Sequence, residues 1–215
     1  MSVEILFNQT ISNQAARLIL DYWFFEYPTS DLATEQDLRW FSGGSVVDQE
    51  IGRRFGYRVE LALAGGFRDW ENEPESGLAL IILLDQFTRN IFRGSHRAFS
   101  GDGRALKLAR RGQSQGLFES LPLMLQVFAL MPLEHSELLS DQTNCVQGMQ
   151  VLRDKASEEE NPRFESFLTY ALEHKTIIER FGRFPHRNVL LGRNSSDDEQ
   201  CYLLTGKDFG QASTM

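Results

Sequence analysis

Four arginines, a histidine and an asparagine lie close together near the C-terminal end of the chain, in a segment without helical periodicity. Guanidinium groups held by a rigid loop are suited to bidentate binding of carboxylate or phosphate groups. The segment therefore predicts a binding site for an anion. The alternative is that its ion pairs only attach the last helix to the body of the protein. The candidate ligand-binding residues here are Arg180, Arg183, Arg187 and Asn188.

A second group of polar residues follows the apolar run 78–84. Asp85 comes directly after that run, so we expect its carboxylate to be buried and to need a partner. Arg89 is four residues further along and shares its helix face. The ion pair of Asp85 and Arg89 either neutralises the charges where the helix leaves the core, or presents hydrogen-bond donors to a cleft. The two roles are compatible. The candidate ligand-binding residues of this group are Asp85, Arg89, Asn90 and Arg93.

An acidic stripe opens the helix expected over residues 134–155. Glu134, Glu137 and Asp141 are spaced i, i+3 and i+7, which places them on one helix face. His135 lies about 100° around the helix from Glu134. The stripe either pairs with the arginines or belongs to a site in which Glu134 binds the ligand. The Glu-x-x-His and His-Glu-x-x-His spacings of metal sites are absent, so no metal is expected.

Histidines are the side chains of these segments whose unperturbed pKa lies nearest neutrality. His135, His174 and His186, together with Glu137, are the candidate catalytic residues. In a stack of antiparallel helices the helix ends gather in layers, so we expect the three segments to meet in one mostly buried polar centre. The residues expected to converge there are Asp85, Arg89, Glu134, Glu137, His174, Arg183 and His186.

Helical periodicity extends over most of the chain and gives the elements that must position these residues. The predicted helices cover residues 11–26, 48–64, 75–91, 102–113, 121–131, 134–155 and 162–181. Ser100 is expected to cap the fourth of them, and the Ser196–Glu199 capping-box pattern predicts a short last helix. Residues 29–45 are expected to form a loop, and the tail from 206 a frayed end. No segment alternates as a strand would, so we predict one all-α domain, residues 1–215, of stacked antiparallel helix pairs.

Composition excludes several classes of protein. The chain has 215 residues, a net charge of −8, sixteen phenylalanines and two cysteines. This aromatic content excludes disorder for most of the chain, and no apolar run approaches the length of a membrane helix. The acidic balance argues against a nucleic-acid partner. We expect a soluble cytoplasmic protein with reduced cysteines, no cofactor and no membrane partner, and the sequence does not constrain its oligomeric state.

At these segments the chain resembles the bacterial domain-of-unknown-function family 924, over nearly its whole length. The resemblance rests on the pattern Leu-Asp-Gln-Phe-x-Arg-Asn-x-x-Arg at 84–93, on Pro-Leu-Glu-His-Ser-Glu at 132–137 and on Arg-Phe-Gly-Arg-Phe-Pro-His-Arg-Asn at 180–188. Thr88 stands where relatives usually have proline. The resemblance implies an all-helical, tetratricopeptide-like fold of stacked helix pairs, and it implies no activity.

Three hypotheses follow for the function. The first is a pocket for a small anionic molecule, with acid–base chemistry by one of the histidines. The second is a tetratricopeptide-like module that binds a peptide or protein in a concave groove without catalysis. The third is a purely structural cluster, in which the charged segments hold the fold together. Whether the protein is an enzyme stays open at this stage.

Overall fold

The computed structural model describes residues 3–24, 40–41 and 44–206, with side chains from residue 14 onward. These residues are helical almost throughout and contain no strand, which confirms the all-α prediction. Within them no helix is long and apolar enough to span a bilayer. Most of the loop expected over 29–45, and all but the first residue of the tail expected from 206, lie outside the described residues.

The most apolar helix of the sequence lies at the centre of the molecule. It begins as α4 (Pro74–Ile81), passes through a π-helical segment, η3 (Ile82–Phe87), and ends as α5 (Thr88–Ile91). Residues 78–84 are at most 1% exposed, and burial of each large aliphatic side chain stabilises the fold by about 2 kcal/mol. Two helices cover this central element, α1 (Val3–Phe24) on α4, and α3 (Ser45–Leu63) on η3 and α5.

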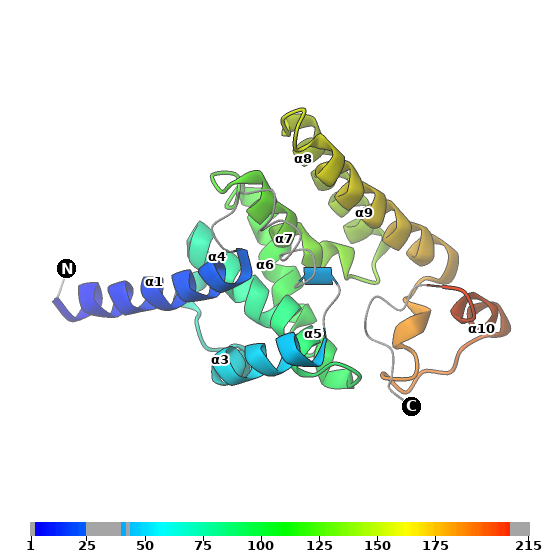
Figure 1. The fold of residues 1–215 in the computed structure, drawn as a ribbon, viewed down its shortest axis with the longest axis horizontal. Helices are drawn as coiled ribbons and strands as arrows, with labels where there is room; N and C mark the ends of the chain where they lie inside the picture. Colours follow the sequence, from blue (N-terminus) through cyan, green and yellow to red (C-terminus); the bar gives the residue numbers. More distant parts are fainter. Residues whose placement is uncertain (1–2, 25–39, 42–43, 207–215) are drawn as a thin grey trace.

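Consecutive helices form the second half of the molecule. They are α6 (Asp102–Gln115), α7 (Leu123–Glu134), α8 (Leu139–Lys155) and α9 (Asn161–Phe181), and each packs on the next along the chain. Figure 1 shows α8 and α9 as one antiparallel arm, with α10 (Asp197–Leu203) beyond the end of α9. Helix α1 packs mainly on α4, although its Tyr22 also contacts Glu50 and Phe55 of α3, and this departs from strictly consecutive pairing. The tetratricopeptide-like superhelix therefore stays a prediction.

The prediction of an acidic stripe on one helix is wrong, because Glu134 ends α7, Glu137 lies in the turn that follows, and Asp141 lies on α8. Helix α7 continues through Pro132 to Glu134, and α8 begins only at Leu139. The turn between them is fixed by the buried Gln142, whose Nε2 donates to the carbonyl oxygens of Glu134 (2.5 Å) and Ser136 (2.7 Å). These contacts need the chain to leave the helix after residue 134. The three acidic residues have different partners, which are His174 for Glu134, Arg193 for Glu137 and Arg110 for Asp141.

Two helix caps were predicted from the sequence, and the structure confirms one of them. The Ser196–Glu199 capping box at the start of α10 is confirmed. Ser100 is not the cap of α6, because its hydroxyl donates to the Arg97 carbonyl oxygen at 2.6 Å instead.

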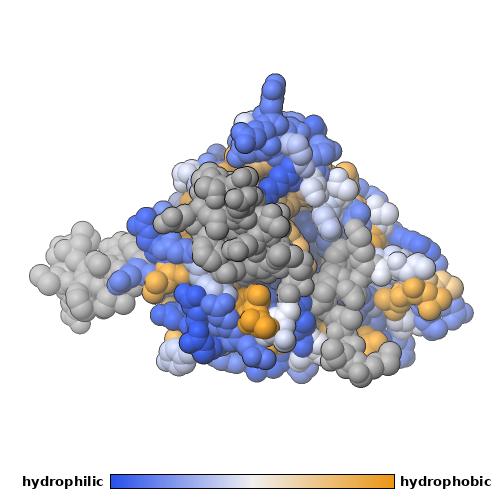
Figure 2. Space-filling model, in the orientation of Figure 1, coloured by the Kyte–Doolittle hydropathy of each residue, from blue (hydrophilic) through white to orange (hydrophobic). Residues whose placement is uncertain are grey.

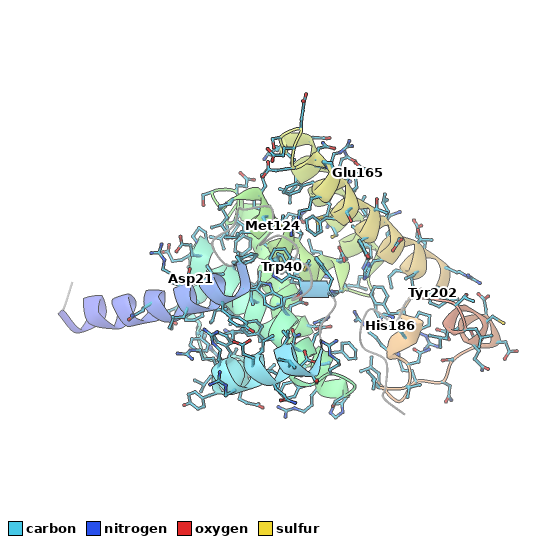
Figure 3. All side chains as sticks on the ribbon, in the orientation of Figure 1. Asp21, Trp40, Met124, Glu165, His186 and Tyr202 are labelled. Carbon is cyan, nitrogen blue, oxygen red and sulfur yellow. The ribbon has the colours of Figure 1, made fainter. Side chains whose placement is uncertain are left out.

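In the interior, Trp40 lies near the middle of the molecule, and its indole donates to the Trp23 carbonyl oxygen at 2.8 Å (Figure 3). The face seen in Figure 2 is mostly hydrophilic, with separate apolar patches.

Candidate functional site

A fully buried carboxylate, Asp85, lies in the π-helical segment η3. Its oxygens are 2.8 and 3.0 Å from Nδ1 of His135, 3.1 Å from Nη1 of Arg89 and 2.6 Å from Nε2 of Gln86. Burial alone would raise the pKa of Asp85, but Arg89 and then His135 lower it well below its usual range. Asp85 is therefore ionised at any physiological pH. A π-helical turn is a frequent feature of functional sites.

His135 caps the C-terminus of α7, and its ring is oriented by Asp85. Because Nδ1 faces an ionised carboxylate, it is the ring nitrogen that bears the proton. No described residue forms a hydrogen bond with Nε2, and the side chain is 17% exposed. Burial and the positive charge of Arg89 lower the pKa of His135. The imidazole is thus neutral near pH 7, with an unused lone pair on Nε2.

Asp102, at the start of α6, binds two guanidinium groups. It is 2.9 and 3.2 Å from the two terminal nitrogens of Arg89 and 3.7 Å from Nη1 of Arg187. Gly101 makes this approach possible, because a Cβ there would lie 2.0 Å from the carbonyl oxygen of Leu84. Asp102 was not among the site residues selected from the sequence. The sequence did contain an indication, because Asp102 and Asp85 are the two acidic residues within residues 85–111.

Arg187 lies in the short 3₁₀ helix η5 (Pro185–Arg187) and is only 6% exposed. Its guanidinium group lies over the rings of Phe184 (4.4 Å) and Phe99 (4.9 Å), and Nη1 donates to the His135 carbonyl oxygen at 3.0 Å. Its buried Nε has no hydrogen-bond partner among the described residues. Burial, followed by the charge of Arg89, lowers the pKa of Arg187 to about 10. The positive charge is therefore incompletely compensated.

A second carboxyl group of the site is neutral near pH 7. Glu134, the last residue of α7, has Oε1 3.5 Å from Nδ1 of His174 on α9. That nitrogen also lies 2.8 Å from the carbonyl oxygen of Tyr170, to which it donates. Burial and the nearby Asp85 raise the pKa of Glu134 to about 8. Cys145 is 4.0 Å from the same carboxyl group, and burial raises the pKa of its thiol.

These side chains form what we call the buried polar centre. It joins η3, α5, α6, α7, α9 and η5, which are far apart in the sequence. His186 belongs to it because burial, followed by the charge of the neighbouring Arg187, lowers its pKa to about 2. Figure 3 shows His186 on η5, and the centroid of its ring lies 5.5 Å from that of Phe184. The members are Asp85, Arg89, Asp102, Glu134, His135, His174, His186 and Arg187.

Other residues selected from the sequence lie outside this centre. Asn90 and Arg93 both bind Asp48 of α3, at 2.8 and 2.7 Å. Arg180 forms an exposed pair with Asp198 at the start of α10. These contacts attach neighbouring helices to each other.

The arginine-rich segment, residues 180–193, contacts α10 through some of its residues and the buried polar centre through others. Arg183 binds Glu199 of α10 at 2.6 Å, and Asn188 donates to the Ser195 hydroxyl at 3.0 Å. Glu137, expected in the centre, instead accepts from Arg193 at 2.7 Å and from the Phe184 amide at 2.8 Å. Arg183 and Arg89 therefore share no carboxylate within the described residues. Only η5, between these anchors, contributes directly to the buried polar centre.

The buried polar centre offers a proton acceptor, Nε2 of His135, and a buried cation, Arg187. Within residues 14–206, apart from the undescribed stretches, no three His, Cys, Asp or Glu side chains are grouped so that they could hold a metal ion. A carboxylate that orients an imidazole through Nδ1 leaves Nε2 available as a proton acceptor. The neighbouring buried guanidinium group of Arg187 supplies positive charge to an anion.

Comparisons with other proteins agree with this fold. The family model described as bacterial protein of unknown function (DUF924) matches residues 19–207. A solved structure, the protein of unknown function ATU0120 from Agrobacterium tumefaciens, is 31% identical with a TM-score of 0.76. The match covers 91% of this chain and 99% of that one. No curated protein matches the chain.

Proposed function

The chain belongs to the bacterial family DUF924, and we propose that its buried polar centre binds a small anionic molecule and exchanges a proton with it. The ligand class is a carboxylate or phosphate, bound by Arg187 and placed against His135. The observation that carries the proposal is the incompletely compensated charge of Arg187 beside the Asp85–His135 pair.

Charge supports the choice of an anion. Asp102 already forms a bidentate pair with Arg89, and its distance to Arg187 is 3.7 Å, which is long for a hydrogen-bonded ion pair. A lowered pKa means that the surroundings disfavour the charged form of Arg187. A bound carboxylate or phosphate would remove this penalty by accepting hydrogen bonds from the guanidinium group.

His135 is the group suited to acid–base chemistry. Its Nε2 lone pair can accept a proton from a bound ligand, and the ionised Asp85 stabilises the imidazolium that forms. Glu134 is protonated near neutrality and can return a proton to the site. Arg89 fixes Asp85 and Asp102 in place and therefore acts as a positioning residue.

A thermal-shift screen against inorganic phosphate, phosphate esters and small carboxylates tests the proposal. A ligand at 100 times its Kd stabilises the folded state by about 2.7 kcal/mol, which should raise the Tm by about 5 °C or more. The shift should disappear in Arg187→Gln and persist in Arg97→Gln, whose guanidinium group is exposed and paired with Glu60. Arg187→Lys keeps the charge without the planar donor set and should retain part of the shift.

The structural alternative gives the opposite result. If the centre only holds the fold together, Arg187→Gln lowers the Tm of the free protein, and no anion raises the Tm of the wild type. A shift of equal size in the wild type and in Arg187→Gln would place the anion elsewhere and contradict the proposal.

A further inference from the structure

A cavity of about 250 Å³ lies between α6, α7 and α8, away from the start of α6 and the end of α7, which contribute to the buried polar centre. Small residues face each other where the three helices meet, namely Ala109, Gly112, Ala129 and Gly148. The two glycines admit large neighbours, because a Cβ on Gly112 would lie 2.2 Å from the Phe118 ring and one on Gly148 would lie 2.7 Å from the Leu130 side chain. The ring of Phe118 and the side chain of Leu152 complete the apolar interior. A cavity of about 150 Å³ already accommodates a benzene-sized molecule.

Two opposite charges lie at the edge of this apolar cavity. Lys155, at the C-terminal end of α8, and Glu119, between α6 and α7, both line it. Both are exposed, and no ion pair of either is found among the described residues. Two of the three glutamine amides that line the cavity are occupied, since Gln126 donates to the Leu121 carbonyl oxygen at 2.6 Å and Gln113 to that of Asn144 at 3.2 Å. The two charges, with the neutral amide of Gln147 beside them, are the polar side chains available to a ligand.

We propose that this cavity binds a free amino acid with an apolar side chain. The apolar group occupies the space between the helices, against Phe118. The α-carboxylate pairs with Lys155, and the α-ammonium group pairs with Glu119. A benzyl or isobutyl group is small enough for the volume, and a zwitterion satisfies a rim that has one charge of each sign. The proposal uses no residue of the buried polar centre and does not depend on the function proposed for it.

Three probes that differ only in their charged groups test the assignment. L-phenylalanine has both charges, 3-phenylpropionate lacks the ammonium group, and 2-phenylethylamine lacks the carboxylate. Affinities are measured by titration of ¹H–¹⁵N spectra of the whole chain. Phenylalanine should bind about tenfold more tightly than either analogue, with shifts concentrated in residues 109–130 and 147–155.

Variants separate the two charges. Lys155→Gln should weaken phenylalanine and 3-phenylpropionate about tenfold and leave 2-phenylethylamine unchanged. Glu119→Gln should weaken phenylalanine and 2-phenylethylamine and leave 3-phenylpropionate unchanged. Lys107→Gln, an exposed lysine of α6 outside the cavity, is the matched control and should alter none of the three.

Filling the cavity tests its location. Ala129→Leu should abolish binding of all three probes while the dispersion of the ¹H–¹⁵N spectrum is retained. If that variant does not fold, Lys155→Gln and Glu119→Gln, at exposed positions, still test the proposed binding. Absence of phenylalanine binding, binding that survives Ala129→Leu in the folded variant, or affinities indifferent to both charge variants would overturn the proposal.

Discussion

Glu134 is the residue whose ionisation most clearly couples this site to stability. Its pKa is raised to about 8 in the folded protein, against 4.5 for a free glutamate. The folded state therefore holds a proton that the unfolded chain releases between these values. The contribution of this proton to the free energy of unfolding is complete below pH 4.5. It is lost as the pH rises toward 8, by on the order of 1 kcal/mol per pH unit.

Glu134→Gln should remove this dependence because the amide does not titrate. Urea unfolding at intervals between pH 5 and pH 8 measures it, and the variant should gain stability relative to the wild type as the pH rises. Glu158→Gln, at an exposed position, serves as the control. Identical pH dependence in the wild type and Glu134→Gln would show that the carboxyl group is ionised in the folded protein.

Asp102 should be important to the buried polar centre although the sequence analysis did not select it. Asp102→Asn leaves the guanidinium groups of Arg89 and Arg187, whose side chains are 12% and 7% exposed, without their common carboxylate. Loss of a partner from a mostly buried ion pair costs about 3 kcal/mol. Asp154→Asn, with a side chain that is 60% exposed, should change the free energy of unfolding by less than about 0.5 kcal/mol. Chemical denaturation of both variants compares them, and equal values would contradict the assigned role.

Contacts within one helix could be predicted from the sequence, and contacts between distant elements could not. The Asp85–Arg89 pair follows from i, i+4 spacing and from the apolar run before it. The pairing of Asp85 with His135 depends on how the end of α7 meets η3, which no spacing specifies. In the same way, Arg93 was correctly expected on the face of Arg89, yet Asp48 of α3 binds it.

Gly101 determines how the first turn of α6 meets the central helix. Gly101→Ala forces a Cβ against the Leu84 carbonyl oxygen and should destabilise the fold by about 3 kcal/mol. Gly103→Ala, two residues along, meets no atom within 4 Å and should be neutral or slightly stabilising, by roughly 0.5 kcal/mol. Thermal unfolding of the two variants provides the comparison. A similar change in Tm for the two variants would mean that Gly101 does not lie close to the Leu84 carbonyl oxygen.

The C-terminal helix depends on Arg183 rather than on the more exposed Arg180. Arg183 binds Glu199, whose side chain is 3% exposed, whereas Arg180 binds Asp198, whose side chain is 60% exposed. Arg183→Gln should therefore speed amide hydrogen exchange of α10 several-fold, and Arg180→Gln should have little effect. Equal exchange rates in the two variants would contradict this difference.

Most helices could be predicted from periodicity, because their apolar stripes face one core. The exception is the region around Pro132, which was expected to separate two helices. The proline remains inside α7, and the real break comes after Glu134, where Gln142 binds the free carbonyl oxygens. That break depends on a tertiary contact, so a local rule placed it a few residues too early.

At the scale of the whole molecule, the buried polar centre lies where the C-terminal segment meets the helical body. Arg187 reaches from η5 to Asp102 of α6 and to the end of α7, and Arg193 binds Glu137 between α7 and α8. The central helix, the α7–α8 turn and the last segment must all be in place before the centre exists. A ligand at this junction would therefore stabilise the assembled fold as a whole.

The central claim is that an anion binds between Arg187 and His135, and the ¹⁵N resonances of the histidine rings test it most directly. Without ligand, His135 should be neutral at pH 7 with its proton on Nδ1, because Asp85 orients it and burial lowers its pKa. Excess inorganic phosphate should raise the pKa of His135 by about one unit, because it adds negative charge beside the ring. The exposed His96 should not respond beyond the effect of ionic strength. An unchanged titration of His135 with phosphate, or an equal change in Arg187→Gln, would contradict the account.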